Sequence, residues 1–312
     1  MPHDPSIEPD QTGPDFDPPI GRAIHLSPTV RRIVAPNPSP MTFRGTNTYI
    51  VGAKALCVID PGPDSDAHLQ AILEAVGPDA QITHILVTHS HVDHSPLAAR
   101  LSQKTAAPVY AFGPSGAGQS DVMKQLAASG ALGGGEGVDH EFQPDVVIQD
   151  QQVIETVDWK ITSLWTPGHF GNHVSFVYGD TVFCGDHVMD WSTSLVSPPD
   201  GDLTQFLWSC RRLIDTQAKR LFPGHGAPIE APSERINWLI SHRKSREAEI
   251  LDALRTEPQT PSDLTKVIYA DVPVHLHPMA ERNVLAHLID LMGRGRVEPQ
   301  GKLHTGARFK LI

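Results

Sequence analysis

Short apolar runs, each ended by a turn containing glycine or proline, recur through the first 240 residues. Runs such as 55–59 and 82–87 have the length of single buried strands, whereas 66–76 places its apolar residues at helical spacing. Strands that alternate with helices in this way are typical of an α/β fold. The pattern therefore predicts layered sheets and helices whose strand ends open onto loops.

The same pattern predicts two antiparallel strand pairs. Residues 30–34 and 47–51 flank a turn rich in Pro, Asn and Ser, and residues 174–178 and 181–184 flank the turn dipeptide Gly179-Asp180. Both pairs should lie in the sheets of the α/β body.

From about residue 237 the pattern becomes mainly helical. Residues 238–254 have helical spacing, Thr260 begins a second helix with Asp three positions on, and Gly293 is the expected C-cap of a third. Residues 296–312 predict two strands about a turn at Gln300-Gly301. Three helices followed by a hairpin are the arrangement of a winged helix, a helix-turn-helix variant.

We therefore predict a flexible N-terminal arm at residues 1–20, an α/β catalytic domain at residues 21–240 and a winged-helix domain at residues 241–312. No apolar run reaches 18 residues and the N-terminus lacks the basic and apolar regions of a secretory signal, so we expect a cytoplasmic protein without a membrane span. The three cysteines are widely spaced and should be buried free thiols.

The formal net charge of −11 is unevenly distributed. Residues 241–312 hold 11 basic and 9 acidic side chains, a net charge of +2, so residues 1–240 carry −13. An acidic body disfavours broad nucleic-acid binding, because neutralising phosphates supplies most of that affinity. A basic strip in the C-terminal segment remains an alternative, although we favour a scaffold or dimer element; its members would be Arg243, Lys244, Arg246, Arg294 and Arg296.

Four metal-ligand side chains crowd into the loop directly after the strand at 82–87. They are His89, His91, Asp93 and His94. Imidazole and carboxylate together suit Zn, Fe or Mn. A loop at a strand end is also where a rigid scaffold usually presents its chemistry, so this loop is the first candidate for a metal site.

Later strands end in glycine-containing turns that carry three more candidates: His169, Asp186 and His225. Seven ligands exceed the need of one tetrahedral site and suit two metals joined by a carboxylate and a hydroxide. We expect one metal on His89, His91 and His169 and the other on Asp93, His94 and His225. Asp186 would bridge them.

These motifs resemble the signatures of the metallo-β-lactamase superfamily: 89–94 is HxHxDH, 166–169 is TPGH, 185–186 is GD and 223–225 is PGH. The resemblance covers about residues 25–240 and implies an αββα sandwich with a dinuclear site at one edge of two sheets. Asp186 is similar to the bridging aspartate of the glyoxalase II-like branch, which the antibiotic-hydrolysing enzymes generally lack.

Two other segments resemble the β-lactamase-like protein 2 family, whose animal member is a mitochondrial endoribonuclease. They are residues 35–38 with 45–49 near the N-terminus, and the winged-helix segment that begins at His242. This likeness makes a single-strand endoribonuclease one alternative for the activity.

One candidate ligand has a second expected role, and two side chains outside the ligand set have expected roles of their own. Asp93 is the candidate catalytic residue, because its position suits orienting the bridging hydroxide and moving a proton to the leaving group. Asp60 would hold a ligand histidine through its free ring nitrogen, or cap a turn. His173 either supports a ligand or is a structural histidine, and His187 has no assigned role.

The leading hypothesis is a hydrolase with two divalent metal ions, zinc first and iron or manganese as alternatives. A metal-bridging hydroxide would cleave a small-molecule ester, thioester, lactone or phosphodiester. RNA is the alternative substrate, and a homodimer remains open. An interpretation from a different class is a nucleic-acid-binding protein whose metal domain is structural, but structural zinc sites are closed and often rich in cysteine.

Overall fold

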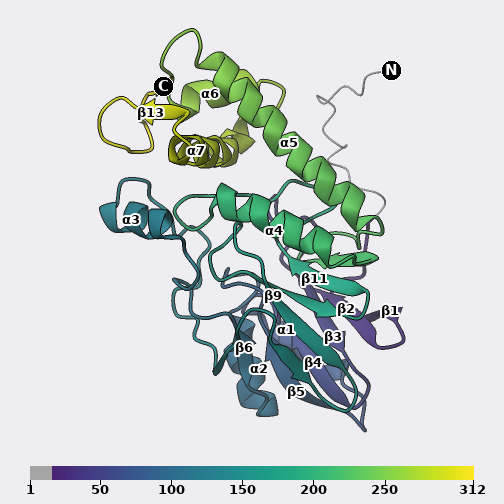
Figure 1. The fold of residues 1–312 in the computed structure, drawn as a ribbon. Helices are drawn as coiled ribbons and strands as arrows, with labels where there is room; N and C mark the ends of the chain where they lie inside the picture. The colour runs from purple at the N-terminus through teal and green to yellow at the C-terminus, as the bar shows by residue number, and fades with distance from the viewer. Residues whose placement is uncertain (1–15) are drawn as a thin grey trace, which may run out of the picture.

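The computed structural model describes residues 16–312, in which two stacked sheets form a body and a smaller helical unit lies at one end (Figure 1). The predicted flexible arm falls mostly outside this range, so it stays a prediction. Within the described part, Ile20 forms an isolated bridge with Val34, and the Phe16 ring stacks on Phe43 with 6.2 Å between centroids.

Among the described residues the first sheet has seven strands in sequential order and the second has five in the order β12-β11-β10-β9-β8. The strands of the first sheet are β1 (Ile24–Ser27), β2 (Val30–Val34), β3 (Asn47–Val51), β4 (Ala55–Ile59), β5 (Gln81–Leu86), β6 (Val109–Ala111) and β7 (Val146–Val147). Those of the second are β8 (Val153–Glu155), β9 (Lys160–Trp165), β10 (Val174–Tyr178), β11 (Thr181–Gly185) and β12 (Arg220–Pro223). Both predicted antiparallel pairs, β2 with β3 and β10 with β11, are confirmed.

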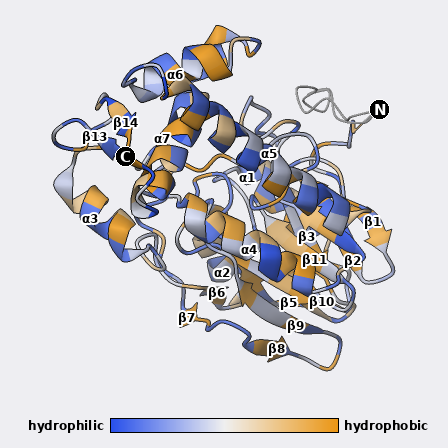
Figure 2. Ribbon diagram, turned by 45° about the horizontal axis from the view of Figure 1, so that its top comes forward, coloured by the Kyte–Doolittle hydropathy of each residue, from blue (hydrophilic) through white to orange (hydrophobic). Residues whose placement is uncertain are grey.

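Helices cover the outer face of each sheet, which confirms the predicted αββα sandwich. Leu69 of α1 (Asp66–Glu74) and Leu101 of α2 (Leu97–Thr105) belong to the hydrophobic cluster of the first sheet. Phe206 of α4 (Leu203–Asp215) and Leu239 of α5 (Pro232–Ala253) belong to that of the second. Aromatic rings such as Tyr49 pack between the sheets, and the central strands are correspondingly hydrophobic (Figure 2).

The C-terminal unit is the predicted winged helix. It consists of the end of α5 with α6 (Pro261–Ile268), η1 (Val274–Leu276), α7 (His277–Gly293), β13 (Val297–Pro299) and β14 (Phe309–Leu311). A capping box starts α6, because the Thr260 side chain accepts from the Asp263 backbone and the Asp263 side chain accepts from the Thr260 backbone. Helix α5 runs without a break through residue 240, so one helix belongs to both units.

Two local predictions in this unit are wrong. Gly293 is the last residue of α7 and Arg294 is its C-cap, because Gly295, at φ 65°, takes the left-handed conformation and donates to the Met292 carbonyl. The two predicted strands are present, but their connection is longer than a turn at Gln300-Gly301, since β13 and β14 pair from Val297↔Leu311 to Pro299↔Phe309 and leave a loop at 300–308.

The segment between β6 and β7 contains α3 (Asp121–Ser129), which packs against the C-terminal unit. Met123 and Leu132 are buried in the same cluster as Ile250 and Val284. This contact explains why the segment is long, since it reaches from the first sheet to the other unit.

Three of the five members of the alternative basic strip do not offer a free, exposed charge. Arg243 is only 2% exposed, while Arg246 pairs with Glu249 and Arg294 with Glu247. The predicted buried free thiols are confirmed for Cys57, Cys184 and Cys210. Within residues 16–312, no helix combines the length and apolar character needed to cross a membrane.

Candidate metal centre

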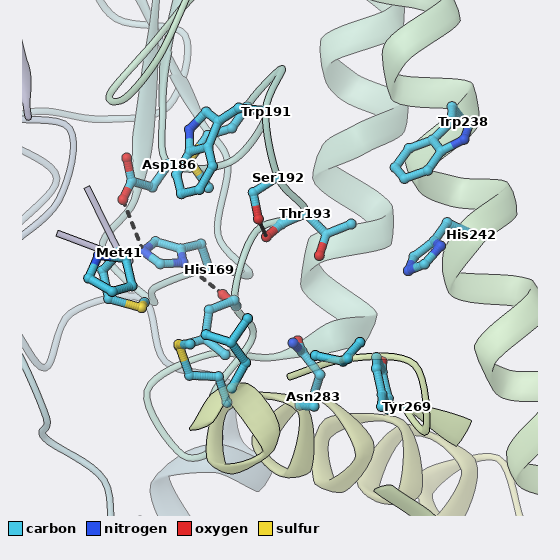
Figure 3. A pocket seen from close by; sticks show the side chains of 17 residues that line it. Met41, His169, Asp186, Trp191, Ser192, Thr193, Trp238, His242, Tyr269 and Asn283 are labelled. Carbon is cyan, nitrogen blue, oxygen red and sulfur yellow. Dashed lines mark hydrogen bonds and ion pairs between the residues drawn. The ribbon is translucent and has the colours of Figure 1, made fainter. Parts of the chain in front are cut away.

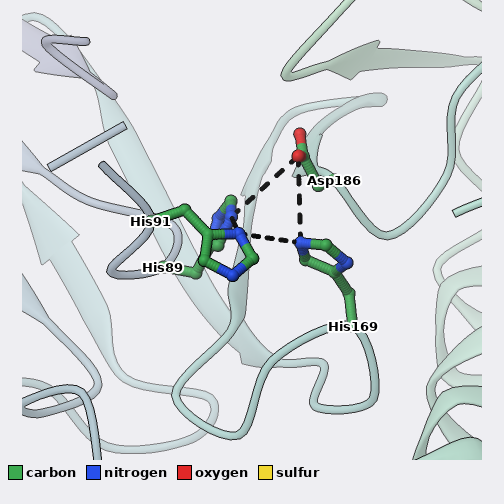
Figure 4. A group of neighbouring side chains, drawn as sticks. All are labelled: His89, His91, His169 and Asp186. Carbon is green, nitrogen blue, oxygen red and sulfur yellow. Dashed lines mark hydrogen bonds and ion pairs between the residues drawn. The ribbon is translucent and has the colours of Figure 1, made fainter. Parts of the chain in front are cut away.

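Three histidines and an aspartate converge at the edge of the two sheets (Figure 4). His89 and His91 follow β5, His169 follows β9 and Asp186 follows β11. Nδ1 of His91 lies 2.9 Å from Nε2 of His89 and 3.1 Å from Nε2 of His169. Oδ2 of Asp186 lies 4.0 Å from Nε2 of His89 and 3.8 Å from Nε2 of His169, which completes a four-ligand group.

Asp93, His94 and His225 form a second group beside the first. Nε2 of His94 lies 3.3 Å from both Oδ2 of Asp93 and Nε2 of His225. Asp186 also faces this group, with Oδ1 at 3.4 Å from Nε2 of His94 and Oδ2 at 3.3 Å from Nε2 of His225. The structure thus brings together all seven candidate ligands, with Asp186 between the two groups.

Three of the candidate ligand histidines have an oxygen partner at the ring nitrogen that faces away from the centre. Nδ1 of His94 lies 2.9 Å from Oδ2 of Asp60, Nδ1 of His169 lies 2.7 Å from the Leu195 carbonyl and Nδ1 of His225 lies 3.3 Å from the Gly45 carbonyl. These acceptors favour a proton on Nδ1, so that Nε2 carries the lone pair whenever the ring is neutral. Lone pairs that face one another at about 3 Å are the arrangement a divalent cation requires, so the donor set fits a metal pair.

Asp60 occupies a strained turn after β4, with φ at 50°. Its Oδ1 accepts from the Thr88 backbone and its Oδ2 accepts from the Thr88 hydroxyl, both at 2.7 Å. The same Oδ2 is the partner of His94. Asp60 therefore joins the start of the ligand loop to one of its histidines.

The histidines of the centre differ in charge because burial and the neighbouring aspartates shift their pKa values in opposite directions. Burial lowers the pKa of His89, of His91 (to about 3) and of His169, which keeps these rings neutral as ligands must be. Burial also acts on His225, but Asp186 and Asp93 outweigh it and raise its pKa to about 9.

For the two carboxylates of the centre, the neighbouring histidines outweigh the effect of burial on the pKa. Burial raises the pKa of Asp93 and of Asp186, but the neighbouring His94 and His225 hold both values well below the usual range. The aspartates are therefore ionised and supply the negative charge that two adjacent cations need.

Gly224 is required by close packing behind the centre. A Cβ at this position would lie 2.2 Å from Oδ1 of Asp186 and 2.7 Å from Cε1 of His94. Any side chain here would displace a candidate ligand. Steric crowding thus explains why the PGH turn has a glycine at this position.

His173 and His187 lie beside the centre but in neither ligand group. The His173 ring is 5.2 Å from that of His89, its Nδ1 contacts the Thr166 hydroxyl at 3.0 Å and its Nε2 has no hydrogen-bond partner among the described residues. His187 packs its ring on Phe206 at 4.4 Å. Both are buried, and burial lowers their pKa values.

A cleft of about 1070 Å³, open solvent included, leads from the centre to the C-terminal unit (Figure 3). His169 and Asp186 lie at one end. The remaining lining residues are mainly apolar: Pro40, Met41, Met189, Trp191, Ser192, Thr193, Leu195, Trp238, His242, Tyr269, Val272, Leu276, Met279, Ala280 and Asn283. The sequence alone does not reveal these residues as one group, because they come from segments far apart in the chain. The one available signal was that Met189 and Trp191 closely follow Asp186.

The cleft carries almost no charge. Among its described lining residues there is no Lys, Arg or Glu, and Asp186 is the one acidic side chain. Burial, followed by the neighbouring Arg243, lowers the pKa of His242 to about 3, so this ring is neutral.

The metallo-beta-lactamase superfamily model matches residues 41–225 and the beta-lactamase associated winged helix domain model matches residues 260–306. The chain therefore belongs to the metallo-β-lactamase superfamily, whose members are generally metal-dependent hydrolases. It is 32% identical over 300 residues to the Beta-lactamase-like protein 2 homolog of Drosophila melanogaster, covering 92% of this chain and 93% of that protein. The expected resemblance is thus confirmed.

Other relatives have different names. An atrochrysone carboxyl ACP thioesterase of Aspergillus fumigatus is 24% identical over 304 residues, covering 91% of this chain and 85% of that protein. Crystal structures of a metallo-beta-lactamase family protein from Thermus thermophilus (TM-score 0.73, 23% identity, 92% and 100% of the two chains) and of a Beta-lactamase domain protein from Burkholderia ambifaria (TM-score 0.77, 20% identity, 96% of each) share the fold.

Proposed function

We propose that the protein is a dinuclear metal-dependent hydrolase that cleaves a carboxylic ester or thioester with a large apolar or aromatic acyl group. The observation that carries this proposal is the uncharged, aromatic and methionine-rich cleft that begins at His169 and Asp186. Hydrolysis would add water across the acyl C–O or C–S bond and release a carboxylic acid with an alcohol or thiol.

The cleft suits an apolar acyl group for two reasons. Burying apolar surface contributes about 25 cal/mol of favourable free energy for each Å² removed from water. A lining of Trp, Met and Leu therefore binds an extended apolar group favourably. Methionine is also flexible and adapts to ligands of irregular shape. The thioesterase named among the relatives supports the same substrate class.

A phosphodiester chain is a poorer match to this cleft. Recognition of nucleic-acid backbones depends on Lys and Arg at the phosphates. The described lining has neither residue, and the buried Arg243 and paired Arg294 do not offer a basic strip nearby. RNA cleavage is therefore the outcome that would most directly oppose the proposal.

Two bound divalent metals would polarise the scissile carbonyl and activate water at neutral pH. His89, His91 and His169 would hold one metal, Asp93, His94 and His225 the other, and Asp186 would bridge. Asp93 would also move a proton to the leaving group, because its side chain is 21% exposed while His94 and His225 are at 0% and 1%. The Thr46 hydroxyl donates to Oδ2 of Asp93 at 3.2 Å and orients it.

Hydrolysis of matched substrates tests the proposal. The metal-loaded chain would be given acetyl and decanoyl thioesters of N-acetylcysteamine, bis(p-nitrophenyl) phosphate and a single-stranded RNA, each beside Asp93→Ala. We expect Asp93-dependent cleavage of the thioesters with kcat/KM rising with acyl length. Asp93-dependent cleavage of RNA without thioester turnover would overturn the proposal.

A substitution in the cleft wall separates substrate binding from chemistry. Met279 is half-buried in α7 and lines the cleft, so Met279→Lys places a charge where the acyl group would lie. We expect a lower kcat/KM for the decanoyl substrate and little change for the acetyl substrate. Met279→Leu, which keeps an apolar side chain, is the matched control.

A further inference from the structure

The loop at 187–198, here called the support loop, connects β11 to the segment before α4 and supplies an acceptor for a candidate metal ligand. The Leu195 carbonyl lies 2.7 Å from Nδ1 of His169. This hydrogen bond directs Nε2 of His169 toward the centre. The position of the support loop therefore determines the orientation of His169.

The residues on either side of Leu195 are held by the C-terminal helices. Arg243 of α5 donates to the Ser194 carbonyl, and the Val196 backbone N–H donates to Oδ1 of Asn283 at 3.1 Å. Arg243 Nη1 donates to the same Oδ1 at 3.0 Å. One asparagine oxygen thus joins α5, α7 and the support loop.

Two more arginines of these helices hold the ends of the support loop. Arg235 of α5 donates to the Met189 carbonyl at 2.7 Å and to the Ser192 carbonyl at 2.8 Å. Arg282 of α7 donates to the Ser197 hydroxyl at 2.8 Å and also to the Pro198 carbonyl. The support loop is therefore anchored along its length by α5 and α7.

If Arg243 served only to pack the two units together, its buried charge would lower stability. It is 2% exposed, no described carboxylate pairs with it, and burial lowers its pKa. A buried cation without a counter-charge costs stability that an apolar side chain would not. Its cost is offset by the hydrogen bonds to Ser194 and Asn283, which act on the support loop.

We propose that Asn283 and Arg243 are positioning residues for His169, so that the C-terminal unit sets the metal affinity of the position formed by His89, His91 and His169. This rests on the proposed metal centre. In this interpretation the winged helix acts on the metal site through Leu195.

Two variants of Asn283 test the hydrogen bonds apart from packing. Asn283→Leu keeps the approximate volume and removes the acceptor, whereas Asn283→Asp keeps an acceptor for both donors. Zinc affinity would be measured for each of two positions by competition with a chromophoric chelator. We expect Asn283→Leu to weaken one position about 10–100-fold and leave the other unchanged, and Asn283→Asp to retain both. Unchanged binding by a folded Asn283→Leu would overturn the proposal.

A control in the same unit separates this effect from general destabilisation. Arg294 makes ion pairs with Glu247 and Asp290 and does not contact the support loop. Arg294→Met should lower the melting temperature without changing either zinc affinity. Equal weakening of both positions in Asn283→Leu would show loss of fold rather than of positioning, and would also contradict the proposal.

A measurement on the metal-free chain keeps this inference separable from the proposed function. The hydrogen-bonded Nδ1–H of His169 should give a protected downfield proton resonance, assigned by its loss in His169→Ala. We expect faster solvent exchange of that proton in Asn283→Leu and not in Arg294→Met. If the unmodified chain binds no metal, the proposed function fails, while the exchange rate still decides whether Asn283 positions His169.

Discussion

The two candidate metal positions are built in different ways. His94 and His225 are oriented from within the body, by the Asp60 carboxylate and the Gly45 carbonyl. His169 is oriented by Leu195, in a loop that α5 and α7 hold from outside. One candidate metal position is therefore oriented by contacts within the body, while the other also depends on contacts made by the C-terminal unit.

Metal removal should have the largest effect on activity, because it empties both metal positions at once. Metals supply several kcal/mol of transition-state stabilisation, so we expect chelation to lower hydrolysis by about 10³-fold or more. Activity should return on adding zinc, as followed by thioester turnover against bound metal. Full activity in a chain shown to be metal-free would contradict the dinuclear centre.

Asp93→Asn should have the next largest effect on activity. It changes the metal position formed by Asp93, His94 and His225, which is oriented from within the body. The amide cannot accept the proton that the carboxylate would carry, and positioned acid–base groups contribute about 10²–10⁴-fold. We expect kcat to fall by that range with the thermal transition little changed. A loss confined to KM would show that Asp93 acts in binding instead.

Asp60→Asn should sharpen the contrast between the two positions. The substitution weakens the acceptor of His94 and disturbs both contacts with Thr88. Partners of ligand histidines are worth about 10–100-fold in metal affinity. The position of Asp93, His94 and His225 should weaken, which is the opposite selectivity from Asn283→Leu. If Asp60→Asn and Asn283→Leu weakened the same metal position, the two positions would not be oriented in different ways.

The smallest effect concerns the stability of the C-terminal unit. Burial, followed by Arg243, holds the pKa of His287 well below its usual value, and neither ring nitrogen has a hydrogen-bond partner among the described residues. The unfolded chain binds a proton below about pH 6.5 while the folded chain does not, so stability is lost as pH falls below that value, by up to about 1.4 kcal/mol per pH unit.

His287→Leu should reduce this pH dependence, as measured by denaturant unfolding at pH 7.5 and 5.5. His304→Leu is the control, because His304 is exposed in the loop between β13 and β14. An unchanged slope in His287→Leu would mean that the ring is protonated in the folded chain.

The sequence predicted those parts of the site that depend on short motifs at strand ends. His89, His91, Asp93 and His94 occupy one loop, and His169, Asp186 and His225 each follow a strand. Strands β11 and β12 are parallel, and β9 runs in the same direction as β11 because both are antiparallel to β10, so these three strands end at one edge of the sheet. Asn283 could not be found in this way. Its role depends on tertiary contacts with Val196 and Arg243, and no local pattern encodes them.

Arg243 shows how such contacts change an interpretation. Together with its basic neighbours Lys244 and Arg246 it suggested an exposed strip as an alternative, yet helical geometry turns Arg243 toward Phe206 and the support loop. The predicted C-cap at Gly293 was one residue too early, because the left-handed conformation that ends the helix is taken by Gly295 and is seen only in the backbone.

The unbroken course of α5 through residue 240 bears on how this unit could be exchanged in evolution. A module joined by a loose linker can be lost or replaced without altering its neighbour. Here the join is a rigid helix whose first turns cover the second sheet and whose last turns form the core of the appended unit. Recombination at this boundary would need to conserve helical phase, so the body and its winged helix would be inherited together.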